Sequence, residues 1–152
     1  HNAASTSEAE TSDEEISLSG YHILLAEDNL LNLEIAEFIL TDAGAVVTKA
    51  CNGEEALQLF IEASPYEYDI ILMDIMMPVM DGYQTTRAIR SLDRPDAKTI
   101  PILAMTANAF AEDRQKTYAA GMDEHLTKPL DTELLLKTIA KYTPEKKAPM
   151  TP

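Results

Sequence analysis

Residues 69–74 read Asp-Ile-Ile-Leu-Met-Asp, a nearly continuous apolar run that ends at the carboxylate of Asp74. An apolar run without polar alternation is typical of a strand covered on both faces, and such strands occur mainly in parallel sheets. We therefore predict a central strand over Asp69–Met73. Four other short segments, mostly apolar or β-branched, are also predicted as strands: His22–Ala26, Val46–Ala50, Pro101–Met105 and Glu124–Leu126.

Helical patterns occupy the intervals between these strands. One helix is marked by an apolar stripe at helical spacing that ends before Gly44: Leu31, Ile35, Phe38 and Ile39. A second is expected after Asn52, a candidate N-cap with Glu55 three residues further on. Three more are expected at about 82–93, 109–120 and 131–142, with Asp81, Asn108 and Asp131 as candidate caps. This alternation predicts an α/β fold, an open parallel sheet with helices on both faces.

The length and the charge of the chain exclude several classes of function. The chain has 152 residues, 45% of them hydrophobic, which suits the core of one ordinary domain and is too short for two. Its 26 acidic and 12 basic residues give a formal charge of −14, which repels phosphate backbones and anionic lipids. We therefore expect no nucleic-acid partner, and the short apolar runs predict no membrane insertion. The single cysteine, Cys51, excludes an internal disulfide and fits a reducing, cytoplasmic compartment.

The two ends of the chain differ in composition from the middle. Residues 1–20 hold five acids and no Lys or Arg, and with few large apolar residues they predict an acidic disordered linker or tail. Residues 144–152 carry three prolines and two lysines and also predict a disordered tail. The expected domain is therefore 21–143, and without the five N-terminal acids the net charge is still −9.

Polar side chains follow the predicted strands at one edge of the sheet. Glu27 and Asp28 come after the first strand, Asp74 after the third, Thr106 after the fourth and Lys128 after the fifth. In open parallel sheets, ligands bind outside the carboxyl ends of the strands. Three carboxylates crowded there repel one another unless a cation neutralises them, and oxygen ligands favour Mg²⁺. A carboxylate can itself be the nucleophile in phosphoryl transfer, which makes Asp74 the candidate acceptor of an aspartyl phosphate.

Four motifs make the sequence similar to a family of known fold. They are Ala-Glu-Asp-Asn at 26–29, Met-Asp-Ile-Met-Met-Pro-Val-Met-Asp-Gly at 73–82, Ala-Met-Thr-Ala-Asn at 104–108 and Leu-Thr-Lys-Pro-Leu at 126–130. Over residues 22–142 the chain resembles a response regulator receiver (CheY-like) domain, and most of all the receiver of a hybrid sensor histidine kinase. The resemblance implies a flavodoxin-like five-stranded parallel sheet in the order 2-1-3-4-5.

The resemblance also implies a role for each polar residue at the sheet edge. Asp74 is the implied phosphoacceptor, and Glu27, Asp28, Asp74 and the backbone carbonyl of Met76 are the implied ligands of Mg²⁺. Thr106 is the implied switch hydroxyl. Lys128 is expected to pair with a phosphoryl oxygen, and the bond between Lys128 and Pro129 is expected to be cis.

The sequence departs from the family pattern at three positions. Glu27 stands where many members have Asp, so a direct metal contact can become a water-mediated one. His125 replaces the usual aromatic switch residue, and titration of its ring near neutral pH would bias the switch; a His satisfied by solvent is the alternative reading. Met76 cannot orient an attacking water, so we predict slow self-dephosphorylation, with Asn108 as the nearby amide. The methionines at 73, 76, 77 and 80 are read as core residues rather than sulfur ligands of a metal.

We therefore predict a phosphoacceptor module of a two-component phosphorelay. The expected partners are the catalytic and dimerisation domain of a histidine kinase and a histidine phosphotransfer domain. A stand-alone response regulator is the alternative to a hybrid-kinase parent, whose receiver would be the cytoplasmic part of a membrane-bound sensor. We expect no separate turnover enzyme, since such a domain assists only its own phosphorylation and dephosphorylation.

Three rival functions remain at this point. A receiver fold used only for docking is disfavoured by the complete set of polar residues at the sheet edge. A phosphatase with an aspartate nucleophile typically has a second Asp two residues later, where Met76 stands here. Flavin binding is disfavoured because the loop after the first strand is acidic and lacks donors that would cradle a phosphate.

Overall fold

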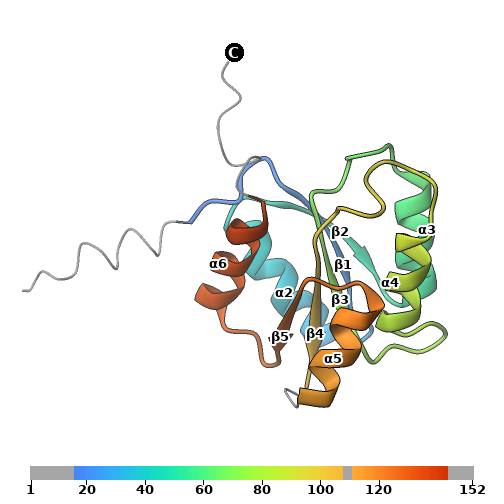
Figure 1. Cartoon of the computed structure of the whole chain (residues 1–152). Coiled ribbons are helices and arrows are strands. Elements are labelled where there is room, and N and C mark those ends of the chain that lie inside the picture. The colour runs from blue at the N-terminus through green and yellow to red at the C-terminus, as the bar shows by residue number, and fades with distance from the viewer. Residues whose placement is uncertain (1–15, 108–110, 144–152) are drawn as a thin grey trace, which may run out of the picture.

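The computed structural model describes residues 16–107 and 111–143, and the side chains of 111–113 are excluded. The strands are β1 (His22–Ala26), β2 (Val46–Ala50), β3 (Ile70–Asp74), β4 (Ile102–Thr106) and β5 (Glu124–Thr127). The helices are α2 (Leu30–Asp42), α3 (Gly53–Glu62), α4 (Gly82–Arg90), α5 (Ala111–Ala120) and α6 (Thr132–Tyr142). All strand pairs are parallel, in the order β2-β1-β3-β4-β5 (Figure 1). The predicted flavodoxin-like sheet is confirmed.

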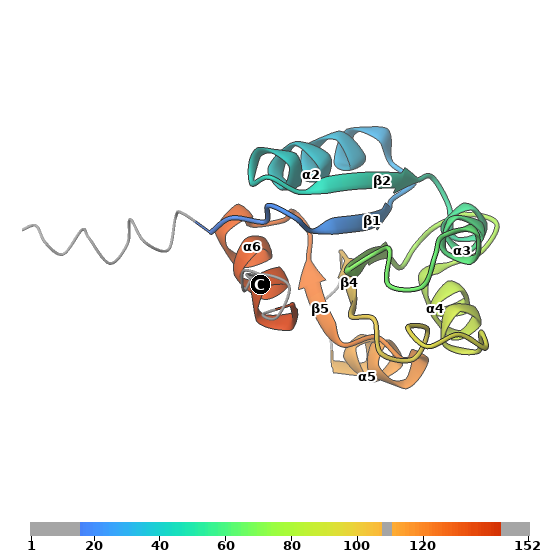
Figure 2. The same ribbon diagram turned by 90° about the horizontal axis from the view of Figure 1, so that it is seen from above.

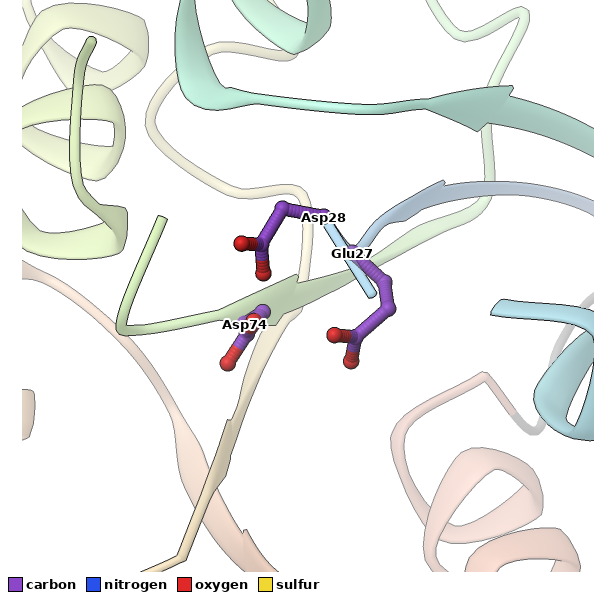
Figure 3. A group of neighbouring side chains, drawn as sticks. All are labelled: Glu27, Asp28 and Asp74. Carbon is purple, nitrogen blue, oxygen red and sulfur yellow. The ribbon is translucent and has the colours of Figure 1, made fainter. Parts of the chain in front are cut away.

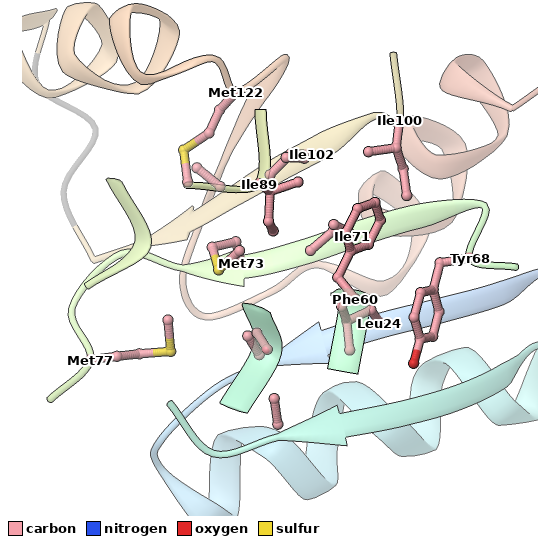
Figure 4. Close-up of a cluster of buried hydrophobic side chains, with 14 of the residues drawn as sticks. Leu24, Phe60, Tyr68, Ile71, Met73, Met77, Ile89, Ile100, Ile102 and Met122 are labelled. Atoms are coloured by element: carbon pink, nitrogen blue, oxygen red, sulfur yellow. The ribbon is translucent and has the colours of Figure 1, made fainter. Parts of the chain in front are cut away.

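Helices cover both faces of this sheet, as Figure 2 shows from above. Helices α2 and α6 lie on one face, where the buried cluster includes Leu33 and Ile139. Helices α3, α4 and α5 lie on the other, where Phe60, Ile89 and Met122 pack together (Figure 4). Successive strand residues point to opposite faces, so Leu24 joins the second cluster while its neighbours in β1 join the first. Strand β3 is buried along its whole length, as its apolar sequence predicts.

The predicted helix caps explain where three helices begin. The side chains of Asn52, Asp81 and Asp131 accept hydrogen bonds from the first-turn backbone N–H groups of α3, α4 and α6. Asp81 also forms a capping box with Gln84. The predicted cap Asn108 lies outside the described residues. Helix α4 ends at Arg90, three residues earlier than the pattern predicts.

Most of the predicted apolar stripe of the first helix faces solvent, and only its last member, Ile39, packs partly against the core. Leu31, Ile35 and Phe38 are exposed, at 65%, 47% and 68% of their surface. The buried face is instead formed by the other stripe of α2: Leu33, Ala36 and Leu40. The helix is apolar around much of its circumference, so spacing alone did not distinguish the face that packs on the sheet. The outer stripe therefore remains as an apolar surface.

Two further expectations need correction. Leu18 was assigned to the N-terminal linker, but it is fully buried, and its N–H donates to the Ala43 carbonyl at 2.7 Å. The packed domain therefore begins before residue 20. Among the methionines after β3, Met77 is buried in the core as expected, whereas Met76 is 75% exposed. Among the described residues, no helix combines the length and the apolar character needed to cross a bilayer.

Candidate functional site

The carboxylates predicted to converge do so at the carboxyl edge of the sheet. Asp74 is the last residue of β3, whereas the prediction placed it just after the strand. Strand β3 lies between β1 and β4. Because Ala26 of β1 pairs with Met73, the next residue, Glu27, is placed level with Asp74. One carboxylate oxygen each from Glu27, Asp28 and Asp74 lie within 4.8 Å of one another. Figure 3 shows the three side chains gathered at the end of β3.

Local hydrogen bonds hold Glu27 in this position. Its backbone N–H donates to the Ala50 carbonyl at 3.0 Å, which extends the pairing of β1 with β2 by one residue. Its Oε2 accepts from the Asn29 N–H at 3.2 Å. The Asn29 side chain in turn accepts from the Asn32 N–H at 2.9 Å and begins helix α2. The start of α2 thus orients the first carboxylate, a role for Asn29 that sequence reasoning missed although the residue belongs to a quoted motif.

Lys128 lies between two of the carboxylates. Its Nζ is 2.9 Å from Glu27 Oε1 and 3.1 Å from Asp74 Oδ1. Its backbone N–H donates to the Thr106 carbonyl at 2.7 Å, and the bond between Lys128 and Pro129 is cis, the isomer that the resemblance implies. Burial opposes the charged ammonium, but the hydrogen bonds and charges of Glu27 and Asp74 outweigh it and raise the pKa of Lys128.

The electrostatics of the site are dominated by buried negative charge. Glu27 and Asp74 are 2% and 3% exposed, whereas Asp28 is open to solvent. Burial, followed by repulsion from Glu27, raises the pKa of Asp74 to about 7, although the Lys128 ammonium acts in the opposite direction. One ammonium therefore faces three carboxylates, and the site has a deficit of positive charge.

The donor set fits a hard divalent cation. Carboxylate oxygens are the ligands that Mg²⁺ and Ca²⁺ prefer, and a cation beside Asp74 would offset the repulsion that raises its pKa. Met73 and Met77 belong to the buried core, whereas Met76 is exposed, and thioether sulfur is a soft ligand that does not suit a hard cation. Glu27, Asp28 and Asp74 are therefore the residues that would hold a metal.

Thr106 and His125, the predicted switch residues, lie on adjacent strands. Thr106 is the last residue of β4 and is buried. His125 is half-buried on β5, where it pairs in register with Ala104. The two strands therefore connect the predicted switch positions through backbone pairing, and the functional role of His125 stays a prediction.

A small hollow and an apolar rim adjoin the carboxylates, and neither was predicted. The hollow has a volume of about 80 Å³ and is lined by Glu27, Asn32, Ile35, Lys128, Pro129 and Leu130. We define the apolar rim as the exposed apolar side chains of the two segments that follow the carboxylates along the chain, α2 and the loop after β3: Leu30, Leu31, Ile35, Met76 and Val79. The unusual number of apolar residues in α2 is the sequence signal for this surface, because they are too many for the single helix face that packs on the core.

Comparisons with a family model and with known proteins agree on one family. The model of the response regulator receiver domain matches residues 23–140. The chain is 37% identical over 135 residues to hybrid signal transduction histidine kinase I of Dictyostelium discoideum. It is 37% identical over 132 residues to the sensor histidine kinase GacS of Pseudomonas protegens. These alignments cover 85% and 86% of this chain but 8% and 14% of the relatives, so the chain spans a small part of their length.

Solved structures of similar fold also include receiver domains. One is the receiver domain of a sensor histidine kinase from Pseudomonas aeruginosa, with a magnesium ion coordinated in its active site cleft. It has a TM-score of 0.75 and 36% identity, over 83% of this chain and 99% of that one. Another contains the Saccharomyces cerevisiae histidine phosphotransfer protein Ypd1 and the receiver domain of Ssk1. Its TM-score is 0.75 at 25% identity, over 87% of this chain and 94% of that one.

Proposed function

This chain belongs to the response regulator receiver family of two-component systems, and on that premise we propose that Asp74 accepts a phosphoryl group from a phosphohistidine in the presence of Mg²⁺. The observation that carries the proposal is the convergence of Glu27, Asp28 and Asp74 within 4.8 Å, with the Lys128 ammonium beside them. A docking module would have no need of this uncompensated charge. The arrangement supports phosphoryl transfer more than mere binding.

The chemistry follows from the side chains. An ionised Asp74 oxygen attacks phosphorus, the bond between phosphorus and the histidine nitrogen breaks, and that nitrogen keeps the electron pair and takes a proton from solvent. Bound Mg²⁺ would supply the positive charge that keeps Asp74 ionised and neutralises phosphoryl oxygens. Lys128, already 3.1 Å from Asp74 Oδ1, moves its charge to the new phosphoryl group. The Thr106 hydroxyl donates to another phosphoryl oxygen.

The switch would act through the strands that end at the site. When Thr106 turns toward the phosphoryl group, it alters the end of β4, and His125 on the paired strand β5 follows. The face made of α5, β5 and α6 then changes, as a two-state element biased by local charge. Met76 offers the site no polar side chain that could orient water, which supports a long-lived phosphoryl group.

The apolar rim supports a protein as phosphodonor. Exposed apolar side chains next to a highly charged site are typical of a surface that another protein covers. A small phosphodonor would gain nothing from Leu31, Ile35 or Val79. We assign this face to a histidine kinase or histidine phosphotransfer domain, in line with the related receiver that was solved together with such a protein.

The similarity to kinases favours a hybrid histidine kinase as the parent. The matched relatives are much longer than this chain, and they are histidine kinases by name. A stand-alone regulator is the second candidate, because solved single-domain response regulators also match. Sequencing of the coding region upstream of residue 1 distinguishes the two.

The decisive experiment measures the mass of the intact protein. The chain is incubated with Mg²⁺ and acetyl phosphate, and the expected product carries one added phosphoryl group. The adduct should be absent in Asp74→Asn and retained in Asp93→Asn, whose carboxylate is exposed and remote in the α4–β4 loop. No adduct in the parent protein would favour a docking module, and an adduct that persists in Asp74→Asn would refute Asp74 as the acceptor.

A further inference from the structure

Gly53 is an unexpected residue for its position. It is the first residue of α3, directly after the N-cap Asn52, and it is buried. Glycine is a poor helix former because it loses the most backbone freedom on folding. Gly20, Gly44 and Gly121 have positive φ angles that explain their identity, and Gly53 does not. Its conformation is open to any residue, so the reason for glycine must lie in its surroundings.

Those surroundings leave no room for a side chain. A Cβ atom at Gly53 would overlap the carbonyl oxygen of Met80 and the Oγ1 of Thr85, and it would lie 3.0 Å from the Met80 carbonyl carbon. Met80 belongs to the loop of residues 75–81, which begins directly after Asp74 and ends where α4 begins. The first turn of α3 is thus in direct backbone contact with the loop that follows the acceptor.

A second glycine, Gly82, is in close contact with the other end of the same loop. A Cβ at Gly82 would lie 2.5 Å from the Asp74 carbonyl oxygen and 2.8 Å from the Ile75 Cα. The Gly82 N–H donates to the Ile75 carbonyl at 2.9 Å. The loop is therefore enclosed between two positions without side chains: Gly82 against the acceptor's own peptide, and Gly53 against Met80. Met76, whose carbonyl is an expected metal ligand, lies within this enclosed loop.

We propose that Gly53 is a positioning residue for the metal and phosphoryl site. The first turn of α3 fixes the Met80 peptide and through it the course of the loop from Asp74 to Asp81. Gly53 itself touches neither metal nor phosphoryl group. The inference rests on the proposed function, and it adds a third element, α3, to the strands that build the site.

A purely structural role would give a different result on substitution. Alanine at Gly53 favours the helical conformation and leaves the N-cap in place, so α3 itself should form at least as readily. The atoms that the new Cβ would meet are the backbone of Met80 and the Oγ1 of the buried Thr85, and none of them is the end of a long flexible side chain. We therefore expect the overlap to be relieved by movement of the loop that contains Met80. Movement of residues that support metal ligands typically weakens metal binding by 10–100-fold.

The test compares Gly53→Ala with Gln58→Ala, an exposed position of the same helix. Mg²⁺ affinity is measured by NMR titration, and the rate of phosphorylation by acetyl phosphate is followed by intact mass. We expect Gly53→Ala to weaken Mg²⁺ binding by about tenfold or more and to slow phosphorylation, with unfolding still cooperative. Gln58→Ala should match the parent protein in both measurements.

A double variant separates the two contacts. In Gly53→Ala/Thr85→Ala the overlap with Thr85 Oγ1 is removed while that with the Met80 carbonyl remains. The loss of Mg²⁺ affinity relative to Thr85→Ala alone should therefore persist. Recovery of the affinity in the double variant, or unchanged affinity in Gly53→Ala, would overturn the proposal.

The parent protein supplies a test that does not depend on the stability of a variant. The sequence has five glycines, so their amide signals are readily followed during a Mg²⁺ titration. Gly53 and Gly82 should shift together with one apparent Kd, whereas Gly44 and Gly121, which precede the amino ends of strands, should not. A Gly53 signal that does not respond would refute the contact pathway. A parent protein that binds no Mg²⁺ and takes no phosphoryl group would instead refute the proposed function.

Discussion

Asp74→Asn should make the metal-free protein more stable at pH 8, although it removes the residue on which the proposed function depends. The parent protein keeps a buried carboxylate whose charged form is disfavoured by burial and by Glu27, so its pKa is about 7 instead of the ordinary 3.8. Asparagine has nearly the same shape and no charge. Lys128 keeps its partner Glu27 at 2.9 Å, so the variant leaves no unpaired ammonium.

The magnitude follows from linkage between protonation and folding. A carboxyl group with a raised pKa in the folded state contributes stability at low pH, and that stability is lost as the pH rises from about 4 to about 7. The difference between about 7 and 3.8 is roughly 3 pH units, each equivalent to 1.36 kcal/mol, or about 4 kcal/mol above pH 7. At pH 5 the folded protein has lost only the stability that disappears between pH 3.8 and pH 5, about 2 kcal/mol.

Thermal unfolding followed by circular dichroism, with a chelator present, measures this difference. Asp74→Asn should raise Tm by roughly 10 °C at pH 8 and by about half as much at pH 5. Asp93→Asn, an exposed carboxylate, serves as the control and should leave Tm nearly unchanged at both pH values. A lower Tm of Asp74→Asn at pH 8, or a gain that does not depend on pH, would show that the carboxylate is not destabilised as argued.

Four further results are expected. Mg²⁺ at 100 times its Kd should stabilise the parent protein by about 2.7 kcal/mol at pH 8, and Asp28→Asn should reduce that gain in thermal unfolding without the chelator. Arg94→Met should lower the free energy of unfolding by about 3 kcal/mol in urea titrations, because Arg94 Nε is 2.7 Å from the buried Asp96 Oδ1; a loss under 1 kcal/mol would contradict a buried ion pair. Met76→Asn should shorten the phosphoryl lifetime in decay assays, and an unchanged lifetime would show that water access is set elsewhere. Ile35→Ser should slow transfer from a phosphohistidine protein, with Ypd1 as the donor, while labelling by acetyl phosphate stays at the parent rate.

The strands and their polar ends were predictable because their local signals agree with the fold. The apolar run at 70–73 can be buried on both faces only in a parallel sheet, and its terminal Asp74 then lies at the binding edge. The placement of Lys128 beside Asp74 followed from the same argument, since both residues come at or just after a strand end.

The face of α2 could not be derived in the same way. Two apolar stripes run along this helix, and a helix with two such stripes has no spacing signal that selects one. Leu33 and Leu40 face the sheet, and the outer positions, including Phe38, are exposed, an outcome that only the tertiary packing decides. Leu18 was missed for a related reason, since the two apolar residues Ile16 and Leu18 are too few for a periodic signal. Leu18 is buried because it joins the core cluster on the α2 and α6 face, where its N–H donates to the Ala43 carbonyl.

The contact of Gly53 with Met80 was also beyond sequence reasoning. The sequence shows a glycine in a helical pattern but not the reason for it, and the steric reason appears only when the loop after β3 is placed against α3. Close approaches of this kind depend on tertiary packing, which no local rule contains.

The hydrogen bond from the Tyr21 hydroxyl to the Thr143 carbonyl, 2.6 Å long and buried, joins the two ends of the packed domain. Both ends lie at the amino edge of the sheet, opposite the carboxylates (Figure 1). A longer polypeptide would therefore enter and leave the domain at one place, and tension between its two arms would act first on the Tyr21–Thr143 hydrogen bond. The carboxylate edge of the sheet would then lie at the end of the domain that is farthest from both connections.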